Sequence, residues 1–209
     1  MAKIKICGLA NYNDSLDATN LGADFLGFHF IKESPKKVSD KMVKDIVSKL
    51  PPFVIAVGVF ENEDKKTIDK TLKKTDLKAV QLNGVESAEF CGAFKNEGIK
   101  VFKFFKLDED ESWILRLQDY VGKVDYLVLD ISFGQGEEIK HNFDLAQKAA
   151  NVGIPFFISG KIGESGIKSA LEKVIPFGFD IDSDIERLPK RKDYEKMLRV
   201  IKLAHGLKI

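Results

Sequence analysis

Short apolar runs recur along this chain, and the segments between them carry apolar residues at helical spacing. The run at residues 3–6 alternates, with Ile4 and Ile6 on one face and Lys3 and Lys5 on the other, which is typical of a short β-strand. The run at residues 54–59 is almost continuously apolar, as in strands that are buried on both faces. By these criteria we expect strands at residues 3–6, 25–30, 54–59, 79–82, 100–105, 126–129, 156–159 and 177–181.

Helices are expected between the strands because most intervening segments begin with a capping residue and end in glycine or proline. Asn13 or Asp14 is expected to cap the first helix, and Ser39 the second, which ends before Pro51. The expected helices cover residues 14–21, 39–50, 62–75 (opening at Asn62 or Asp64), 87–96, 108–120, 143–152, 164–174 and 193–204.

Eight strand–helix units therefore follow one another at a fairly even pitch, with no linker or low-complexity segment between them. Repeated units of this kind require a parallel sheet with the helices outside it. Eight of them favour closure into a (β/α)8 TIM barrel, whereas a doubly wound open sheet of six strands would leave two units over. We predict a single (β/α)8 barrel domain over residues 1–209, with its functional site where the carboxyl ends of the strands meet.

The composition is that of an ordinary globular protein and excludes several other classes. Lys and Arg total 33 against 32 Asp and Glu, and no block of like charge suggests a nucleic-acid surface. The chain starts on a strand rather than a signal peptide, and no apolar run is long enough to span a bilayer. Cys7 and Cys91 lie far apart without metal-ligand spacing. We therefore expect a reduced, cytoplasmic protein without nucleic-acid or membrane partners.

Chemically active residue types are expected just after the strands. Cys7 follows the first strand and Asp130 the sixth. A thiol in such a place acts as a base or nucleophile only where its surroundings lower its pKa. His141 is expected in the loop after the sixth strand, His29 at a mid-strand, inner-barrel position, and Cys91 in the core on the fourth helix.

The order and spacing of motifs resemble the phosphoribosylanthranilate isomerase family over essentially the whole chain. The motifs of the first half are specific to that family, and those of the second half keep the register to the end. The first set is Lys5-Ile6-Cys7-Gly8, Gly22-Ala23-Asp24, Gly27-Phe28, Ser34-Pro35-Lys36-Lys37-Val38-Ser39, Leu50-Pro51-Pro52-Phe53-Val54, Val57-Gly58-Val59-Phe60 and Ala79-Val80-Gln81-Leu82-Asn83-Gly84. The second set is Leu129-Asp130, Phe143-Asp144, Ser159-Gly160, Phe179-Asp180 and Lys192-Asp193.

The resemblance implies an Amadori rearrangement in tryptophan biosynthesis, which converts an aminoaldose phosphate to an aminoketose phosphate without a cofactor. It implies Asp130 as the acid that protonates the furanose oxygen and Cys7 as the base that takes the proton from the sugar C2′. These roles call for a cationic or hydrogen-bonded setting that favours the thiolate, and for burial that raises the pKa of the aspartate. A phosphorylated small molecule is the implied substrate, bound by a monomer or homodimer.

Four departures from the family pattern fall in the ligand-binding parts. Lys36 stands where the family has an arginine that pairs with the anthranilate carboxylate, so the charge is kept and the bidentate fork is lost. Asn83 replaces the histidine of Gln-Leu-His-Gly. After the sixth strand, residues 137–140 replace a Gly-Gly-x-Gly run in the loop, and glycines appear earlier, at Gly134 and Gly136.

The fourth departure lies in the phosphate site, which the family builds from backbone N–H groups after strands seven and eight. Those places read Ser159-Gly160-Lys161 and Asp182-Ser183-Asp184 here. Lys161 adds a cation, whereas Asp182 and Asp184 place two carboxylates near a dianion. The expected substrate-binding residues are Lys36, Asn83, Gly160, Lys161 and Ser183.

Three interpretations of the carboxylates stay open. In the first, Asp182 and Asp184 point away or pair with Lys161, Lys190 or Arg191, and main-chain groups still hold the phosphate. In the second, Asp180, Asp182 and Asp184 share a strand face and hold Mg²⁺ or Ca²⁺; no other metal ligands are expected. In the third, the site has changed its ligand, and the chain is a diverged non-isomerase homologue that binds another small molecule or a partner.

Overall fold

The structure is a computed structural model that describes residues 1–107, 112–131, 137–160 and 163–206, and its parallel strands close into a ring. Strands β1 to β8 pair in sequence order, and β8 pairs with β1. The strands are β1 (Lys3–Ile6), β2 (Phe25–His29), β3 (Ile55–Phe60), β4 (Ala79–Leu82), β5 (Lys100–Lys106), β6 (Tyr126–Asp130), β7 (Phe156–Ser159) and β8 (Gly178–Ile181). The predicted (β/α)8 barrel is confirmed.

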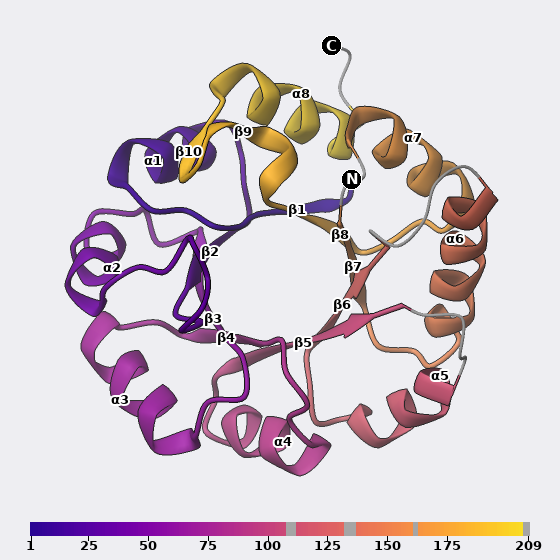
Figure 1. Ribbon diagram of the computed structural model, residues 1–209, viewed down its shortest axis with the longest axis horizontal. Helices are drawn as coiled ribbons and strands as arrows, with labels where there is room; N and C mark the ends of the chain where they lie inside the picture. The colour runs from indigo at the N-terminus through magenta and orange to yellow at the C-terminus, as the bar shows by residue number, and fades with distance from the viewer. Residues whose placement is uncertain (108–111, 132–136, 161–162, 207–209) are drawn as a thin grey trace.

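The helices surround the ring, as Figure 1 shows. They are α1 (Tyr12–Asn20), α2 (Asp40–Val47), α3 (Lys65–Thr75), α4 (Ala88–Asn96), α5 (Ser112–Leu117), α6 (Glu137–Ala150), α7 (Gly163–Lys173) and α8 (Tyr194–Ala204). Ser39, Asp64 and Ser87 cap α2, α3 and α4 with their side-chain oxygens. The cap of α1 is Asn11, which accepts the N–H of Asp14, and not Asn13 or Asp14 as expected.

The alternation within the strands sorts side chains between two apolar regions. Ile4 and Ile6 of β1 face the helices and belong to the large core there. The opposite faces of the strands meet inside the ring, where Phe25 of β2 lies 5.3 Å from Phe102 of β5, ring centroid to ring centroid. Since β2 and β5 are not neighbours, this contact crosses the barrel. The buried interior cluster consists of Phe25, Val57, Ala79, Phe102, Val128 and Phe157.

Two larger differences from expectation lie in the second half of the chain. Helix α6 starts at Glu137, six residues before the expected start. The sequence does not reveal its first turns because they are polar and the apolar periodicity begins only at Phe143. After β8 comes a short 3-10 turn, η2 (Ser183–Ile185), and then an unpredicted hairpin of β9 (Glu186–Leu188) and β10 (Arg191–Lys192). Strands of three and two residues are too short to show a pattern in sequence.

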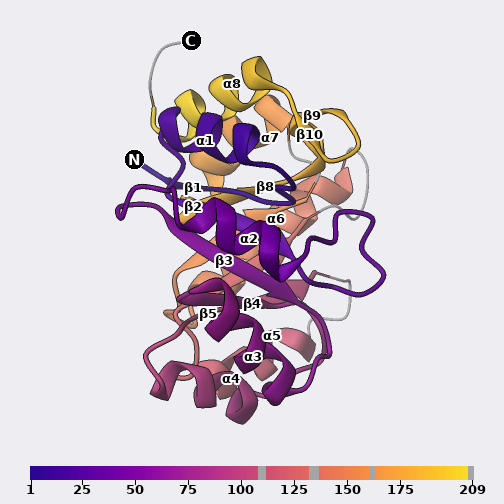
Figure 2. The same ribbon diagram turned by 90° about the vertical axis from the view of Figure 1, so that its left-hand side faces the viewer.

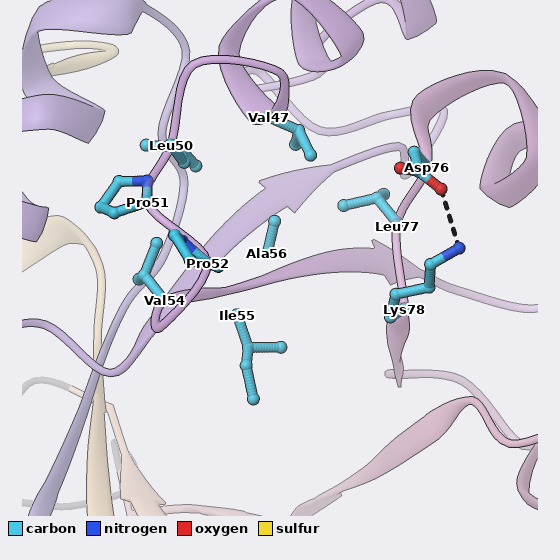
Figure 3. A pocket seen from close by; sticks show the side chains of 10 residues that line it. All are labelled: Val47, Leu50, Pro51, Pro52, Val54, Ile55, Ala56, Asp76, Leu77 and Lys78. Carbon is cyan, nitrogen blue, oxygen red and sulfur yellow. Dashed lines mark hydrogen bonds and ion pairs between the residues drawn. The ribbon is translucent and has the colours of Figure 1, made fainter.

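The two ends of the barrel differ in character. Figure 2 shows the strands side-on, with the long connection between β2 and α2 extending beyond their carboxyl ends. At the opposite end lies a pocket of about 370 Å³, lined mostly by apolar side chains such as Val47, Leu77 and Ile55 (Figure 3). Ile55 is the first residue of β3, so this pocket is at the amino-terminal face, where TIM barrels do not carry out chemistry. No helix in the described part of the chain is both long and apolar enough to cross a membrane.

Candidate functional site

Cys7 is buried at the mouth of the barrel, directly after β1. The alternation that turns Lys5 inward turns Cys7 inward as well, and Lys5 Nζ donates a hydrogen bond to Cys7 Sγ over 3.1 Å. The same ammonium group donates to both carboxylate oxygens of Asp180 on β8, at 2.8 and 2.9 Å. Room for the sulfur depends on Gly27 of β2, because a Cβ there would lie 2.6 Å from Sγ. Lys5 thus holds the thiol and the first and last strands together.

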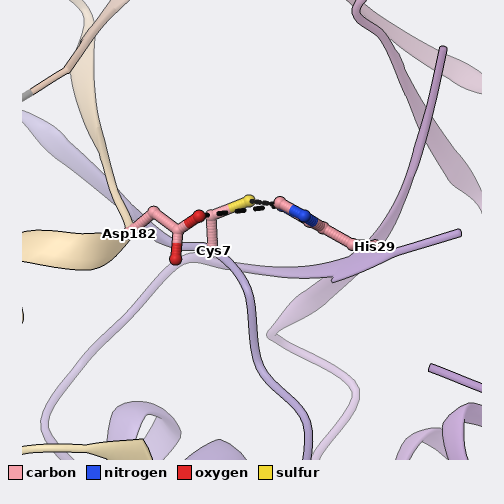
Figure 4. Close-up of side chains that lie close together, drawn as sticks. All are labelled: Cys7, His29 and Asp182. Carbon is pink, nitrogen blue, oxygen red and sulfur yellow. Dashed lines mark hydrogen bonds and ion pairs between the residues drawn. The ribbon is translucent and has the colours of Figure 1, made fainter. Parts of the chain in front are cut away.

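His29 is a second neighbour of the thiol, after Lys5, that the sequence did not assign to the site. It is the last residue of β2 rather than a mid-strand one, and its Nε2 lies 3.3 Å from Cys7 Sγ (Figure 4). Its Nδ1 lies 3.0 Å from Ser34 Oγ, which fixes the ring plane. The expected inner-barrel position is correct. Phe25, Gly27 and His29 alternate on the inward face of β2. A predicted strand that ended at residue 29 instead of 30 would have placed His29 at the mouth, beside Cys7.

Asp182 completes this side of the mouth, after β8. Its Oδ1 accepts hydrogen bonds from Lys36 Nζ at 2.6 Å and Lys192 Nζ at 2.9 Å, and its Oδ2 lies 3.8 Å from His29 Nε2. Burial alone would raise the pKa of Asp182, but Lys192, His29 and Lys36 together hold it well below its usual range. The carboxylate is therefore ionised and neutralised by lysines. Among the described residues, the lysines that pair with it are Lys36 and Lys192, and not the Lys190 or Arg191 of the first interpretation, while Lys161 lies outside those residues.

The surroundings of the thiol meet only part of what the implied role of a base calls for. Burial raises the pKa of Cys7 to about 12, although the ammonium of Lys5 opposes the shift. The cation that the chemistry calls for is present, but the cost of desolvating a thiolate outweighs it. Burial also lowers the pKa of His29. At neutral pH the structure therefore presents a neutral thiol beside a neutral imidazole.

The three aspartates after and within β8 serve separate structural roles. Asp180 pairs with Lys5, Asp182 pairs with Lys36 and Lys192, and Asp184 accepts the backbone N–H of Gly163 at 3.2 Å. Asp184 is thus the anion at the amino terminus of α7, where a helix favours negative charge. Because β8 ends at Ile181 and Asp184 lies in η2, the three aspartates do not share the strand face that the suggested Mg²⁺ or Ca²⁺ site requires.

Of the predicted binding residues, only Lys36 and Ser183 are seen in contact with each other among the described residues. Lys36 and Ser183 contact each other, with Lys36 Nζ 3.0 Å from Ser183 Oγ, and both belong to the cluster around Asp182. Asn83 follows β4, and its Oδ1 accepts from Gln81 Nε2 at 3.0 Å. Gly160 follows β7 with φ of 112°, a conformation that suits glycine. Lys161, like the Gly134-Gln135-Gly136 segment, lies outside the described residues.

Asp130 occupies the last position of β6, three strands around the ring from β1 by way of β8 and β7. It follows Tyr126 and Val128 on the inward face, so it lies at the mouth on a different side from Cys7. Residues 137–140 and His141 belong to α6. Their expected place, in the loop after the sixth strand, is therefore wrong. Cys91 is fully buried on α4, as predicted.

Comparison with known proteins relates this geometry to one family. A family model described as N-(5′-phosphoribosyl)anthranilate (PRA) isomerase matches residues 4–203. The N-(5′-phosphoribosyl)anthranilate isomerase of Pelobacter propionicus is 35% identical over 207 residues, which cover 98% of this chain and 96% of that protein. The corresponding protein of Thermotoga neapolitana is 34% identical, with 99% and 100% covered.

Solved structures agree with the sequence relatives. The phosphoribosylanthranilate isomerase of Thermotoga maritima superposes with a TM-score of 0.90 at 32% identity, covering 99% of this chain and 100% of that one. Another structure of such an isomerase, in complex with reduced 1-(o-carboxyphenylamino)-1-deoxyribulose 5-phosphate, gives a TM-score of 0.83 at 32% identity, over 99% and 100% of the two chains. With a matching family model, relatives above 30% identity over nearly the whole chain and a shared closed barrel, this chain belongs to the N-(5′-phosphoribosyl)anthranilate isomerase family.

Proposed function

We propose that this chain catalyses the Amadori isomerisation of N-(5′-phosphoribosyl)anthranilate in tryptophan biosynthesis, with Cys7 as base and Asp130 as acid. The observation that carries the assignment of roles is the placement of a thiol and a carboxyl group on inward faces at the carboxyl ends of β1 and β6. Two groups on different sides of the mouth reach two different atoms of a substrate held between them.

The reaction divides into two proton transfers. Asp130 gives a proton to the furanose oxygen as the C1′–O bond breaks, and the nitrogen lone pair forms the iminium at C1′. Cys7 then takes the proton from C2′, and the electrons of that C–H bond form the enamine, which tautomerises to the ketone. No electrons leave the substrate, so the chemistry requires no redox partner.

His29 lies where it can accept the proton of the buried Cys7 thiol. Since burial raises the pKa of Cys7 to about 12, the thiol needs an acceptor for its proton before it acts as a base. His29 Nε2 is 3.3 Å from Sγ, and Asp182 Oδ2 is 3.8 Å from the same nitrogen, where it stabilises an imidazolium. We assign His29 and Asp182 this role in activating Cys7.

Substrate binding is assigned to the expected residues. Lys36 binds the anthranilate carboxylate. To do so its Nζ gives up the ion pairs with Asp182 and Glu186, which are 2.6 and 3.0 Å long in the structure. Gly160, Lys161 and Ser183 hold the phosphate, and Asn83 lines the other side of the mouth. The two unpaired thiols, Cys7 and Cys91, are in keeping with a reducing cytoplasm, which we propose as its location.

The test is isomerase activity of purified protein, together with growth of a tryptophan auxotroph that lacks the enzyme. We expect Cys7→Ser and Asp130→Asn to lower kcat by about 10²–10⁴-fold, the usual contribution of a general base or acid. Cys91→Ala is the matched control, because it removes the other thiol from the core of α4 and should keep turnover. A well-folded wild-type protein with no turnover would overturn the proposal and favour the non-isomerase alternative.

A further inference from the structure

Three atoms of the kinds that bind transition metals converge at the mouth of the barrel. They are Cys7 Sγ, His29 Nε2 and a carboxylate oxygen of Asp182, all within 4.8 Å of one another (Figure 4). They come from the residue after β1, the last residue of β2 and the turn after β8, which are adjacent where the ring closes. Among the described residues, this is the group of three His, Cys, Asp or Glu side chains that offers such a set.

The distances fit a tetrahedral zinc site. With Zn–S near 2.3 Å and Zn–N near 2.0 Å, the sulfur and nitrogen of a tetrahedron lie about 3.5 Å apart, and nitrogen and oxygen about 3.4 Å apart. The observed separations are 3.3 Å between Sγ and Nε2, and 3.8 Å between Nε2 and Asp182 Oδ2. The third separation, from Sγ to the Asp182 oxygen, is at most 4.8 Å, against about 3.6 Å in such a tetrahedron, so closing the three atoms on an ion asks for movements of about 1 Å.

The second layer of contacts already orients the ligands. The Nδ1 of His29 lies 3.0 Å from Ser34 Oγ, so an Nδ1–H donated there leaves the Nε2 lone pair facing the sulfur. Lys36 and Lys192 bind Oδ1 of Asp182, and Oδ2 is the oxygen nearer His29. Contacts of this type fix ring orientation and ligand basicity in metal sites.

The charge around the cluster does not exclude a dication. Three ammonium groups lie in it, those of Lys5, Lys36 and Lys192, and three carboxylates pair with them, those of Asp180, Asp182 and Glu186. An ion that displaces the thiol proton enters a neutral set of groups and adds one net positive charge. Binding of the ion replaces the hydrogen bond from Lys5 Nζ to Sγ, while the ion pair between Lys5 and Asp180 is retained.

We infer that Cys7, His29 and Asp182 form a Zn²⁺ site with an open fourth position, and that bound Zn²⁺ inhibits the enzyme. The ion binds the sulfur as the thiolate and releases its proton, so Cys7 is no longer free to take a proton from substrate. Sulfur and imidazole ligands favour zinc over Mg²⁺ and Ca²⁺, which prefer oxygen. The inhibition rests on the proposed function, whereas the binding of the ion does not.

The test begins with metal binding by the full chain. Protein is titrated with Co²⁺ to read the thiolate-to-cobalt charge-transfer band, and Zn²⁺ is then added in competition. We expect one ion per chain, displaced by Zn²⁺ and not by excess Mg²⁺. Cys7→Ser should abolish the band, and His29→Gln and Asp182→Asn should each raise the Kd at least tenfold. Cys91→Ala should retain both band and stoichiometry.

A second measurement separates this proposal from the assigned activity. Isomerase turnover is followed with added Zn²⁺ and then with excess chelator, and we expect inhibition that the chelator reverses. Wild-type protein that turns over but takes up no stoichiometric Co²⁺ or Zn²⁺ would overturn the zinc site and leave the function standing. Stoichiometric metal binding by a protein without isomerase turnover would overturn the proposed function and leave the zinc site standing. Unchanged affinity in His29→Gln and Asp182→Asn, checked for folding by circular dichroism, would also overturn it.

Discussion

Replacing Asp180 with asparagine should destabilise the barrel because it leaves the ammonium group of Lys5 buried without its carboxylate. The Lys5 side chain is 0% exposed and that of Asp180 4%, and the two hydrogen bonds between them are 2.8 and 2.9 Å long. Breaking a buried pair by removing one partner typically costs about 3–5 kcal/mol. At about 2.1 cal/mol/K per residue, the unfolding entropy of 209 residues is about 0.44 kcal/mol/K. Asp180→Asn should therefore lower Tm by about 7–11 °C.

The assay is thermal and urea unfolding of wild type, Asp180→Asn, Lys5→Met and the double variant. The double variant removes both charges, so it should be more stable than Asp180→Asn and deviate from additivity by more than 1 kcal/mol. Equal stability of Asp180→Asn and wild type, or additive losses in the double variant, would refute the reasoning.

The pH dependence gives an independent check of the same pair. In the wild type, burial lowers the pKa of Lys5, but Asp180 and Cys7 raise it above the ordinary 10.5, so its stabilising contribution is complete below pH 10.5. Without Asp180, burial should bring the pKa of Lys5 below 10.5, and the unfolded state would then bind more protons. The stability of the variant relative to wild type should therefore increase as pH rises from 7 towards 10. A constant difference would indicate a packing defect instead.

Two further predictions concern the thiol and the phosphate site. In a Cys91→Ala background, alkylation of Cys7 by iodoacetamide should rise about tenfold per pH unit from pH 7 to 10, because its pKa is raised to about 12; a plateau below pH 9 would contradict this. Asp184→Asn should lower KM about fivefold with little change in kcat, since removing a like charge next to the proposed phosphate-binding residue Ser183 is worth about 1 kcal/mol. Steady-state kinetics measures this, and a higher KM would show that the Asp184 contact with Gly163 matters more for the site than its charge does.

The fold was accessible from sequence because the barrel strands are locally encoded. Residues 79–82 and 156–159 have the bounds that their apolar runs predicted, and the motifs around Cys7 and Asp130 led to the correct family. Helix α6 shows the limit of periodicity, since its first six residues carry no apolar pattern and their helical conformation follows from the elongation of a helix that is anchored further on.

The partners of the site residues were not accessible in the same way. The sequence makes Asp182 look like an obstacle to phosphate, because the lysines that pair with its carboxylate are its neighbours in space and not in sequence. Lys36 is 146 residues away and Lys192 reaches back from a hairpin that the sequence did not reveal. Likewise, burial and not the nearby cation decides the protonation of Cys7, and burial is a property of the closed ring.

Closure of the ring by β1 and β8 also sets the time at which the site comes into being during synthesis. Lys5 and Asp180 are 175 residues apart in the chain, so the ribosome makes the thiol long before it makes the strand that buries it. At about 5–20 residues per second, roughly 9–35 s pass between Cys7 and Asp180. Over that interval Cys7 has neither Asp180, Asp182 nor Lys192 around it and behaves as an ordinary exposed thiol. Its loss of reactivity towards alkylating agents therefore marks the completion of folding on or off the ribosome.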